Sequence, residues 1–239
     1  MKDKKSTQIA QKEVHKAKLK ESKIRRTAPS FQIPKPTRVE RQRFLIVCEG
    51  LSTEPDYFYH LRQYFRITAA EIVSIGGAGE TIRVVERAKK EAGKSPFDQI
   101  WVVFDKDDFP SDHFDNAIRM AEAAKFGVAY SNQAFEYWLI LHFEDHQGGA
   151  MHRNQYSEKL KTYLSQHNVF YDTRDQKSIN TEMFRVLVGK DPKIDKNRLD
   201  LAIIRAEKVL GFHSPLFSPA SAESSTTVFR LVRELLKFL

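Results

Sequence analysis

The sequence predicts an α/β fold, in which a mostly parallel sheet is flanked by helices and followed by a C-terminal helical extension. Two apolar runs, at 44–48 and 100–104, have no polar break, and each is followed closely by carboxylates. Such runs are typical of strands that are buried on both faces of a parallel sheet. Helical spacing of apolar residues separates these runs, and this alternation indicates βαβ units.

Residues 44–130 predict four strands and three helices. After the strand at 44–48, Ser52, Thr53 and Pro55 indicate a helix start with a hydroxyl cap and an early proline. The remaining elements are expected in this order: a strand at 71–75, a helix at 80–92, a strand at 99–104, a helix at 112–125 and a strand at 127–130.

Beyond residue 133 the patterns are helical. The segment 135–143 is apolar nearly all round, which predicts a deeply buried helix. Further helices are expected near 155–167, 178–188, 196–210 and 226–239. We therefore expect three parts: a basic N-terminal arm at 1–41, an α/β domain at 42–145, and a helical region at 146–239 that packs on it.

Composition places the chain among globular proteins of the cytoplasm. The 239 residues are 41% hydrophobic and 11% aromatic, which is enough for a sizeable core. The single cysteine, Cys48, lies in a predicted strand and cannot form an intramolecular disulfide. No apolar stretch approaches the roughly 18 residues of a membrane span, and the charged N-terminus lacks the apolar segment of a secretory signal. These observations predict a cytoplasmic protein without a membrane partner.

The formal net charge of +8 is concentrated at the N-terminus. Residues 1–43 contain 14 Lys and Arg against 4 Asp and Glu, whereas the remainder contains 25 against 27. A basic arm is a common source of sequence-independent affinity for nucleic acid. The alternative is a solvated tail that only aids solubility. The arm residues expected to bind nucleic acid are Lys18, Lys20, Lys23, Arg25 and Arg26.

Acidic residues follow the two most apolar strands. Glu49 follows the first strand, and Asp105 and Asp107 follow the strand at 99–104, with Lys106 between them as a candidate for nucleic-acid contact. In an open α/β sheet the ligand crevice lies outside the carboxyl ends of the strands, so these acids are expected to converge. The sequence offers nothing obvious to neutralise them, which favours a hard divalent cation such as Mg²⁺ or Mn²⁺. The alternative is that they are helix caps or solvated loop acids.

Several other positions carry weaker signals. Glu136 lies in an otherwise apolar helix, where an unpaired acid costs several kcal/mol, so it is expected at the site or in a structural hydrogen bond. Gly50 would let the backbone approach a ligand closely. His142 is expected to be a core histidine, and the glycine-rich segment 76–79 to be a plain turn. The hydroxyl residues at 224–227 are expected to form an N-cap cluster, with a phosphate contact as the less favoured alternative.

Four sequence blocks together resemble a known family. They lie at 48–58, 104–108, 131–143 and 224–228, and in this order they are similar to the RloB-like proteins, which are encoded beside restriction–modification and abortive-infection genes. The Glu49-Gly50 and Asp105-x-Asp107 pieces also resemble the TOPRIM domain of topoisomerases, bacterial primases and overcoming-lysogenization-defect nucleases. The resemblance covers the chain from about residue 42 to the C-terminus and implies a TOPRIM-like, Rossmann-like sheet.

The resemblance also implies roles for individual residues. Glu49 would act as general acid/base or metal ligand, Asp105 and Asp107 would hold Mg²⁺, and Glu54 would hold a second ion, as in two-ion phosphodiester cleavage. Glu136 is a further catalytic candidate, because it is an acid in an otherwise apolar helix. The chain has no Gly-x-x-x-x-Gly-Lys-Ser/Thr motif, so any ATPase of the AAA or ABC type would be a separate partner.

The sequence thus favours a metal-dependent nuclease or phosphotransfer enzyme of anti-phage defence. Two alternatives stay open at this point. One is a module that binds nucleic acid or a partner ATPase without cutting, and the other is a Rossmann-like phosphatase or nucleotide-binding enzyme. The choice between DNA and RNA, the number of metal ions and the oligomeric state are not determined by these patterns.

Overall fold

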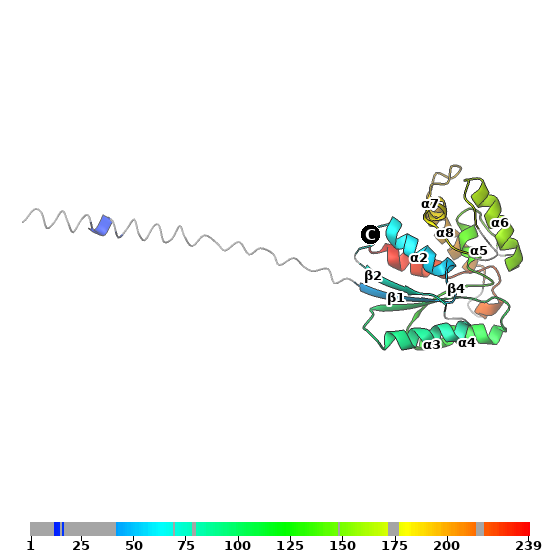
Figure 1. The fold of residues 1–239 in the computed structure, drawn as a ribbon, viewed down its shortest axis with the longest axis horizontal. Helices are drawn as coiled ribbons and strands as arrows, with labels where there is room; N and C mark the ends of the chain where they lie inside the picture. The colour runs from blue at the N-terminus through cyan, green and yellow to red at the C-terminus, as the bar shows by residue number, and fades with distance from the viewer. Residues whose placement is uncertain are drawn as a thin grey trace, which may run out of the picture. The chain divides into compact units, whose positions relative to one another are not determined.

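The computed structural model describes residues 12–14, 16, 42–68, 70–77, 80–147, 149–171, 177–213 and 218–239. Contacts divide the chain into two units, Met1–Val39 and Glu40–Leu239. The fold described below is that of the second unit (Figure 1). The expected arm residues Lys18, Lys20, Lys23, Arg25 and Arg26 lie outside the described residues.

A four-stranded, fully parallel sheet forms the centre of this unit. Its strands are β1 (Gln42–Cys48), β2 (Ala70–Ile75), β3 (Gln99–Asp105) and β4 (Gly127–Ser131), in the order β2-β1-β3-β4. The predicted α/β class and parallel sheet are confirmed. The chain passes from β1 to β2 on one side and then returns to β3 on the other. The direction of winding therefore reverses between β1 and β3, which is where open α/β sheets bind ligands.

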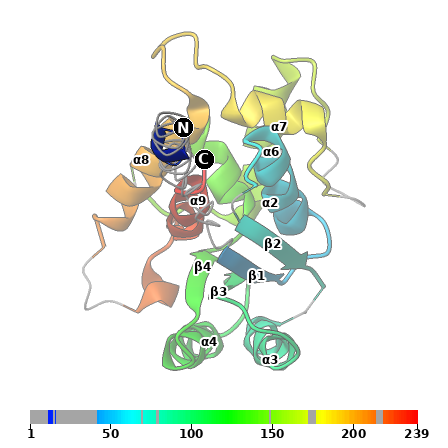
Figure 2. The same cartoon turned by 90° about the vertical axis from the view of Figure 1, so that its left-hand side faces the viewer.

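Helices cover both faces of the sheet (Figure 2). Helices α3 (Thr81–Ala92) and α4 (Ser111–Ala123) cover one face, and α2 (Thr53–Tyr64) and α9 (Val228–Leu236) lie on the other. The alternation of side chains along β1 supplies both interfaces, since successive residues of a strand point to opposite faces. Leu45 and Val47 pack with α3 and α4, whereas Phe44 and Ile46 pack with α2 and the C-terminal helices.

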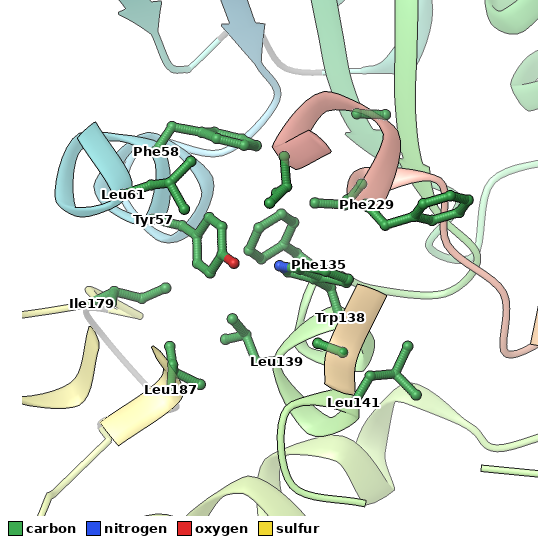
Figure 3. Close-up of a cluster of buried hydrophobic side chains, with 14 of the residues drawn as sticks. Tyr57, Phe58, Leu61, Phe135, Trp138, Leu139, Leu141, Ile179, Leu187 and Phe229 are labelled. Atoms are coloured by element: carbon green, nitrogen blue, oxygen red, sulfur yellow. The ribbon is translucent and has the colours of Figure 1, made fainter. Parts of the chain in front are cut away.

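The C-terminal region adds further helices on the α2 side of the sheet. They are α5 (Glu136–Leu141), α6 (Arg153–Ser165), α7 (Thr181–Val188) and α8 (Arg198–Leu210). A short 3₁₀ turn at Pro219–Ser221 packs instead against α4, with Ala220 in the core on that face of the sheet. Figure 3 shows the shared core of the helices on the α2 side, in which Tyr57, Phe135 and Trp138 lie among aliphatic side chains from α5, α7 and the segment before it. All six residues of α5 are buried, as its sequence predicted, although the helix is shorter than the apolar segment.

The hydroxyl-rich segment 224–227 covers the edge of β4. Thr226 forms an antiparallel bridge with Ser131, and the Thr227 hydroxyl accepts a hydrogen bond from the backbone N–H of Tyr130 (2.9 Å). An uncovered edge strand would expose unpaired backbone groups, and this segment satisfies them. Thr227 is the N-cap residue of α9 but makes no side-chain capping bond, so the predicted capping role was wrong for it.

Candidate active site

Five carboxylates line one pocket of about 360 Å³ at the carboxyl ends of β1 and β3. Glu49 follows β1, and Asp105 is the last residue of β3. Asp107 lies in the loop after β3, Glu54 in the first turn of α2, and Glu136 at the start of α5. The structure therefore brings together every acid that the sequence nominated as catalytic or metal-binding. The pocket lies at the reversal of winding between β1 and β3, where the strand ends leave an open crevice.

Glu49 and Asp105 are joined through the ladder between their strands. The backbone N–H of Glu49 donates to the carbonyl of Val103 (2.9 Å), which continues the β1–β3 pairing by one residue. The backbone N–H of Asp105 donates to Oε2 of Glu49 (3.0 Å). Oδ2 of Asp105 accepts from the backbone N–H of Phe135 (2.8 Å), while its Oδ1 is buried without a hydrogen-bond partner in the structure. A buried acceptor without a partner is costly, so this oxygen marks where a ligand would be stabilised.

The turn after β1 is shaped by Glu54. The backbone N–H of Gly50 donates to Oε1 of Glu54 (3.2 Å), and a Cβ atom at residue 50 would overlap the Glu54 carboxylate. The missing side chain at Gly50 thus leaves room for the Glu54 carboxylate beside the backbone. The backbone N–H of Gly77 donates to the carbonyl of Gly50 (2.9 Å), so Gly77 supports this wall of the pocket. Ser52 makes no side-chain capping bond, contrary to the predicted hydroxyl cap.

Two cations from the C-terminal region reach the acids. Arg153 forms an ion pair with Asp107, and Nζ of Lys177 lies 2.8 Å from Oε1 of Glu136. The hydroxyl of Tyr171 also donates weakly to Glu136 (3.4 Å). The expectation that nothing obvious neutralises the strand-end acids was therefore wrong for Asp107, whereas Glu136 has the partner that its apolar surroundings require. Sequence reasoning missed both cations because neither belongs to a motif, and each is brought to the pocket only by long-range packing.

Burial and mutual repulsion favour the protonated forms of Glu49, Glu54 and Asp105. Burial raises the pKa of Glu49 to about 7, and the charges of Asp107 and Glu54 add to this rise against the opposing hydrogen bond from Asp105. Burial likewise raises the pKa of Glu54 to about 7, with Glu136 and Asp107 contributing repulsion. Burial and four neighbouring carboxylates raise the pKa of Asp105 well above its ordinary value. Charged forms are disfavoured here because low-dielectric surroundings and like charges both oppose ionisation.

The chemistry of these donors fits a hard divalent cation. All five are carboxylates, which are the ligands that Mg²⁺ and Mn²⁺ prefer, and Oδ1 of Asp105 has an unused acceptor position. In the described part of the chain, however, no three His, Cys, Asp or Glu side chains are grouped as a ready ion site. Two of the five acids are held by Arg153 and Lys177 in this arrangement. Binding an ion therefore requires the carboxylates to draw together.

Comparison with known families matches residues 44–235 to a family model described as RloB-like protein. The chain belongs to the RloB-like family. All five carboxylates and both cations of the pocket fall within the matched residues. Searches of curated proteins and of solved structures found no significant match. In the described residues of this RloB-like protein, no helix combines the length and apolar character needed to cross a bilayer.

Three polar residues that follow β3 and β4 in this RloB-like protein lie away from the pocket lining. Lys106 is partly exposed, and its backbone N–H donates to the carbonyl of Ser131 (3.0 Å), but its side chain is not among those that line the pocket. Asp108 is exposed. Asn132, which follows β4, donates its amide to the carbonyls of Pro219 and Ala220 (2.9 and 3.0 Å), so it ties the 3₁₀ turn to the sheet.

His142 lies in the core, as the sequence predicted. Its side chain is fully buried, with Nε2 3.3 Å from the hydroxyl of Tyr57 and the two rings stacked. Burial lowers the pKa of His142 to about 3, and the charges of Arg205 and Arg198 act in the same direction. The residue is therefore neutral at physiological pH and serves the packing between α2 and α5.

Proposed function

We propose that this RloB-like protein is a Mg²⁺- or Mn²⁺-dependent nuclease, or a related phosphotransfer enzyme, that acts on nucleic acid in defence against phage. The observation that carries the proposal is the convergence of five carboxylates in one pocket at the reversal of winding. The predicted similarity to TOPRIM enzymes agrees with this arrangement and is part of the proposal. Function is argued from the site because one fold supports many activities.

The residues of the pocket divide into two roles in this proposal. Asp105, Asp107, Glu49 and Glu54 hold divalent ions, which supply charge neutralisation and a Lewis acid for phosphodiester cleavage. The alternative role for Glu49 is that of general acid/base in place of metal ligand, because its pKa of about 7 without a bound ion allows both protonation states near neutral pH. Glu136 fixes Lys177 at the pocket wall through their ion pair.

Charge counting favours two ions over one. When all five carboxylates are ionised, Arg153 and Lys177 leave three negative charges uncompensated. One divalent ion leaves the pocket with one excess negative charge, which would repel a phosphodiester. Two divalent ions leave one excess positive charge, which a phosphodiester anion balances. A two-ion site is therefore the arrangement that is electrostatically matched to a nucleic-acid substrate.

The proposal includes the surroundings of the site. The basic arm at 1–41 supplies affinity for the polyanion. Any ATPase of the AAA or ABC type that acts with this protein would be a separate partner, because the sequence contains no Gly-x-x-x-x-Gly-Lys-Ser/Thr motif. The cytoplasm, where foreign nucleic acid is encountered, is the expected location.

A cleavage assay tests the proposal. Purified protein is incubated with plasmid DNA, single-stranded DNA and tRNA in Mg²⁺ or Mn²⁺, alongside Asp105→Asn and Glu49→Gln. Cleavage that requires the metal and is lost in both variants is expected. Asp108→Asn is the matched control, because Asp108 is an exposed acid three residues from Asp105 that does not line the pocket. Equal cleavage by the wild type and by both pocket variants would contradict the proposal.

The two ion pairs favour a second candidate, a module that binds nucleic acid without cutting. Arg153 and Lys177 already neutralise two of the acids, and a pocket that stays in this arrangement would not gather metal ions. This candidate would be favoured if the protein binds polynucleotides without metal and cleaves none of them in Mg²⁺ or Mn²⁺, with or without an added ATPase. Hydrolysis of small phosphate esters alone would instead favour a phosphatase.

A further inference from the structure

A second pocket of about 380 Å³ adjoins the carboxylate pocket. The two share Glu136, Arg153 and Lys177 in their linings. Among the residues that the structure describes, the remaining lining of the second pocket is formed by Ala134, Asn154 and Ser157 and includes no other acid. The described polar groups of this pocket are therefore two cations and two side chains that can donate hydrogen bonds, with Glu136 as the opposing charge.

The backbone near both cations is held in place by hydrogen bonds to neighbouring segments. The carbonyl of Lys177 accepts from the hydroxyl of Thr53, and the backbone N–H of Ile179 donates to Oδ2 of Asp56 (3.1 Å). These bonds attach the segment 177–179 to the first turn of α2. On the other side, the backbone N–H of Met151 donates to the hydroxyl of Ser224 (3.0 Å), just before Arg153.

The side chains of the cations are less confined than their backbones. Arg153 is 29% exposed and Lys177 is 38% exposed, whereas Glu136 is 5% exposed. Both cations border both pockets, so each can turn from its carboxylate toward the second pocket while its backbone stays in place. Asn154 and Ser157 lie in the first two turns of α6, a helix of 13 residues, with their side chains beside Arg153.

We propose that the second pocket binds a phosphate group of the nucleic-acid substrate, and that Arg153 and Lys177 exchange their carboxylate partners for that phosphate. The inference rests on the proposed function, since it assigns a position to the substrate of that same site. A divalent ion bound by Asp107 would displace Arg153 from that carboxylate, and a phosphate would compete with Glu136 for the ammonium group of Lys177. The guanidinium and ammonium groups both form strong charge-assisted hydrogen bonds with phosphate.

Phosphate binding in the absence of any cleavage is the first test. Inorganic phosphate is titrated against Mg²⁺-saturated protein at constant ionic strength, with chloride as the reference anion, and binding is followed by ³¹P line broadening. Arg153→Gln and Lys177→Gln are each expected to weaken phosphate binding by about tenfold or more, the usual loss for a hydrogen bond to a charged group. Lys161→Gln is the matched control, because this α6 lysine pairs with Glu158 and lines neither pocket.

Metal affinity supplies a readout with the opposite sign. Arg153 competes with metal ions for Asp107, so Arg153→Gln is expected to tighten Mn²⁺ binding while it weakens phosphate binding. A purely structural role for Arg153 would weaken both ligands together, and that result would overturn the inference. Lys177→Arg should keep most of the phosphate affinity, because it preserves the charge at the same backbone position.

The outcomes separate this inference from the proposed function. Cleavage of nucleic acid with unchanged phosphate affinity in both Gln variants would overturn the inference and leave the nuclease proposal intact. The expected phosphate and Mn²⁺ shifts, in a protein that cleaves no polynucleotide, would support the phosphate pocket and count against the nuclease.

Discussion

The backbone N–H of Asp105 donates to the carboxylate of Glu49 across 3.0 Å, although 56 positions separate the two residues in the chain. This bond joins the ends of β1 and β3, the two strands between which the winding of the sheet reverses. It fixes one oxygen of Glu49 beside Asp105, whose own Oδ1 stays buried without a partner. The pair defines the centre of the candidate site.

The first prediction concerns metal-dependent stability. An ion that binds only the folded protein stabilises it by about 2.7 kcal/mol at one hundred times its dissociation constant. Mg²⁺ or Mn²⁺ should therefore raise the Tm of the wild type. Asp105→Asn should raise the metal-free Tm slightly, because it relieves repulsion among the acids, and should abolish the response to metal. Asp108→Asn should respond as the wild type does, and a full response in Asp105→Asn would exclude Asp105 as a ligand.

The second prediction concerns pH. The pKa of Glu49 is raised to about 7 in the folded protein, so between about 4.5 and 7 the folded state holds more protons than the unfolded state. Stability contributed by this group is therefore lost as the pH rises through that window. As the pH rises through this window, the unfolding free energy of Glu49→Gln should increase relative to that of the wild type by at most about 1.4 kcal/mol per pH unit. Contact of Glu49 with solvent makes the increase smaller.

Urea unfolding of both proteins without metal, from about pH 5 to pH 7, measures this difference. The variant must be compared with the wild type at each pH, because buried His142 makes the unfolding free energy of both proteins rise with pH. Burial lowers the pKa of His142 to about 3, so the folded state favours its neutral form. Saturating Mg²⁺ should flatten the difference. A constant difference across the window would show that Glu49 titrates normally.

The third prediction concerns the turn after β1. Gly50→Ala would place a Cβ atom against the Glu54 carboxylate, so Glu54 must move and its bond from the Gly50 backbone N–H is lost. The expected cost is about 1–3 kcal/mol of unfolding free energy, with a weaker stabilisation by metal. Gly93→Ala is the control, because a Cβ there meets its nearest atom at an ordinary 3.6 Å. Equal effects of the two substitutions would argue against a shaped turn at Gly50.

The fourth prediction concerns the basic arm. Deletion of residues 1–39 should leave the fold intact, because Glu40–Leu239 forms a compact unit by itself. The deletion should weaken binding to nucleic acid. It should also make the plot of log binding constant against log salt concentration less steep, by about 0.7–0.9 for each phosphate that the arm neutralises. A full-length variant with Gln at the five arm positions Lys18, Lys20, Lys23, Arg25 and Arg26 separates charge from length. Unchanged affinity and salt slope in both would mean that the arm does not bind nucleic acid.

Local patterns predicted most elements of the fold. The apolar runs of β1 and β3 and the helical spacing of α3 and α4 match the observed elements to within a few residues. These elements are recognisable because burial of one or both faces determines which positions along the sequence are apolar. The helix starts were less well predicted. Ser52 and Thr227 are hydroxyl residues at N-cap positions, yet neither caps its helix by a side-chain bond.

The acids of the candidate site were also predictable, for a topological reason. Glu49 and Asp105 terminate buried strands, and parallel strands that feed right-handed crossovers present their carboxyl ends at one edge. Once the strands were recognised, the convergence of the acids followed. Glu136 was identified because an acid in an apolar helix needs a partner.

The sequence by itself determined the parallel α/β architecture and the acidic edge of the sheet, because both depend on short-range periodicity and on the direction of the strands. Only the tertiary structure decided how the acids are paired. Lys177 is 41 residues from Glu136 and Arg153 is 46 from Asp107, and no local pattern links either pair. Their meeting depends on how the C-terminal helices pack over the sheet, since charge pairing is set by distance in space.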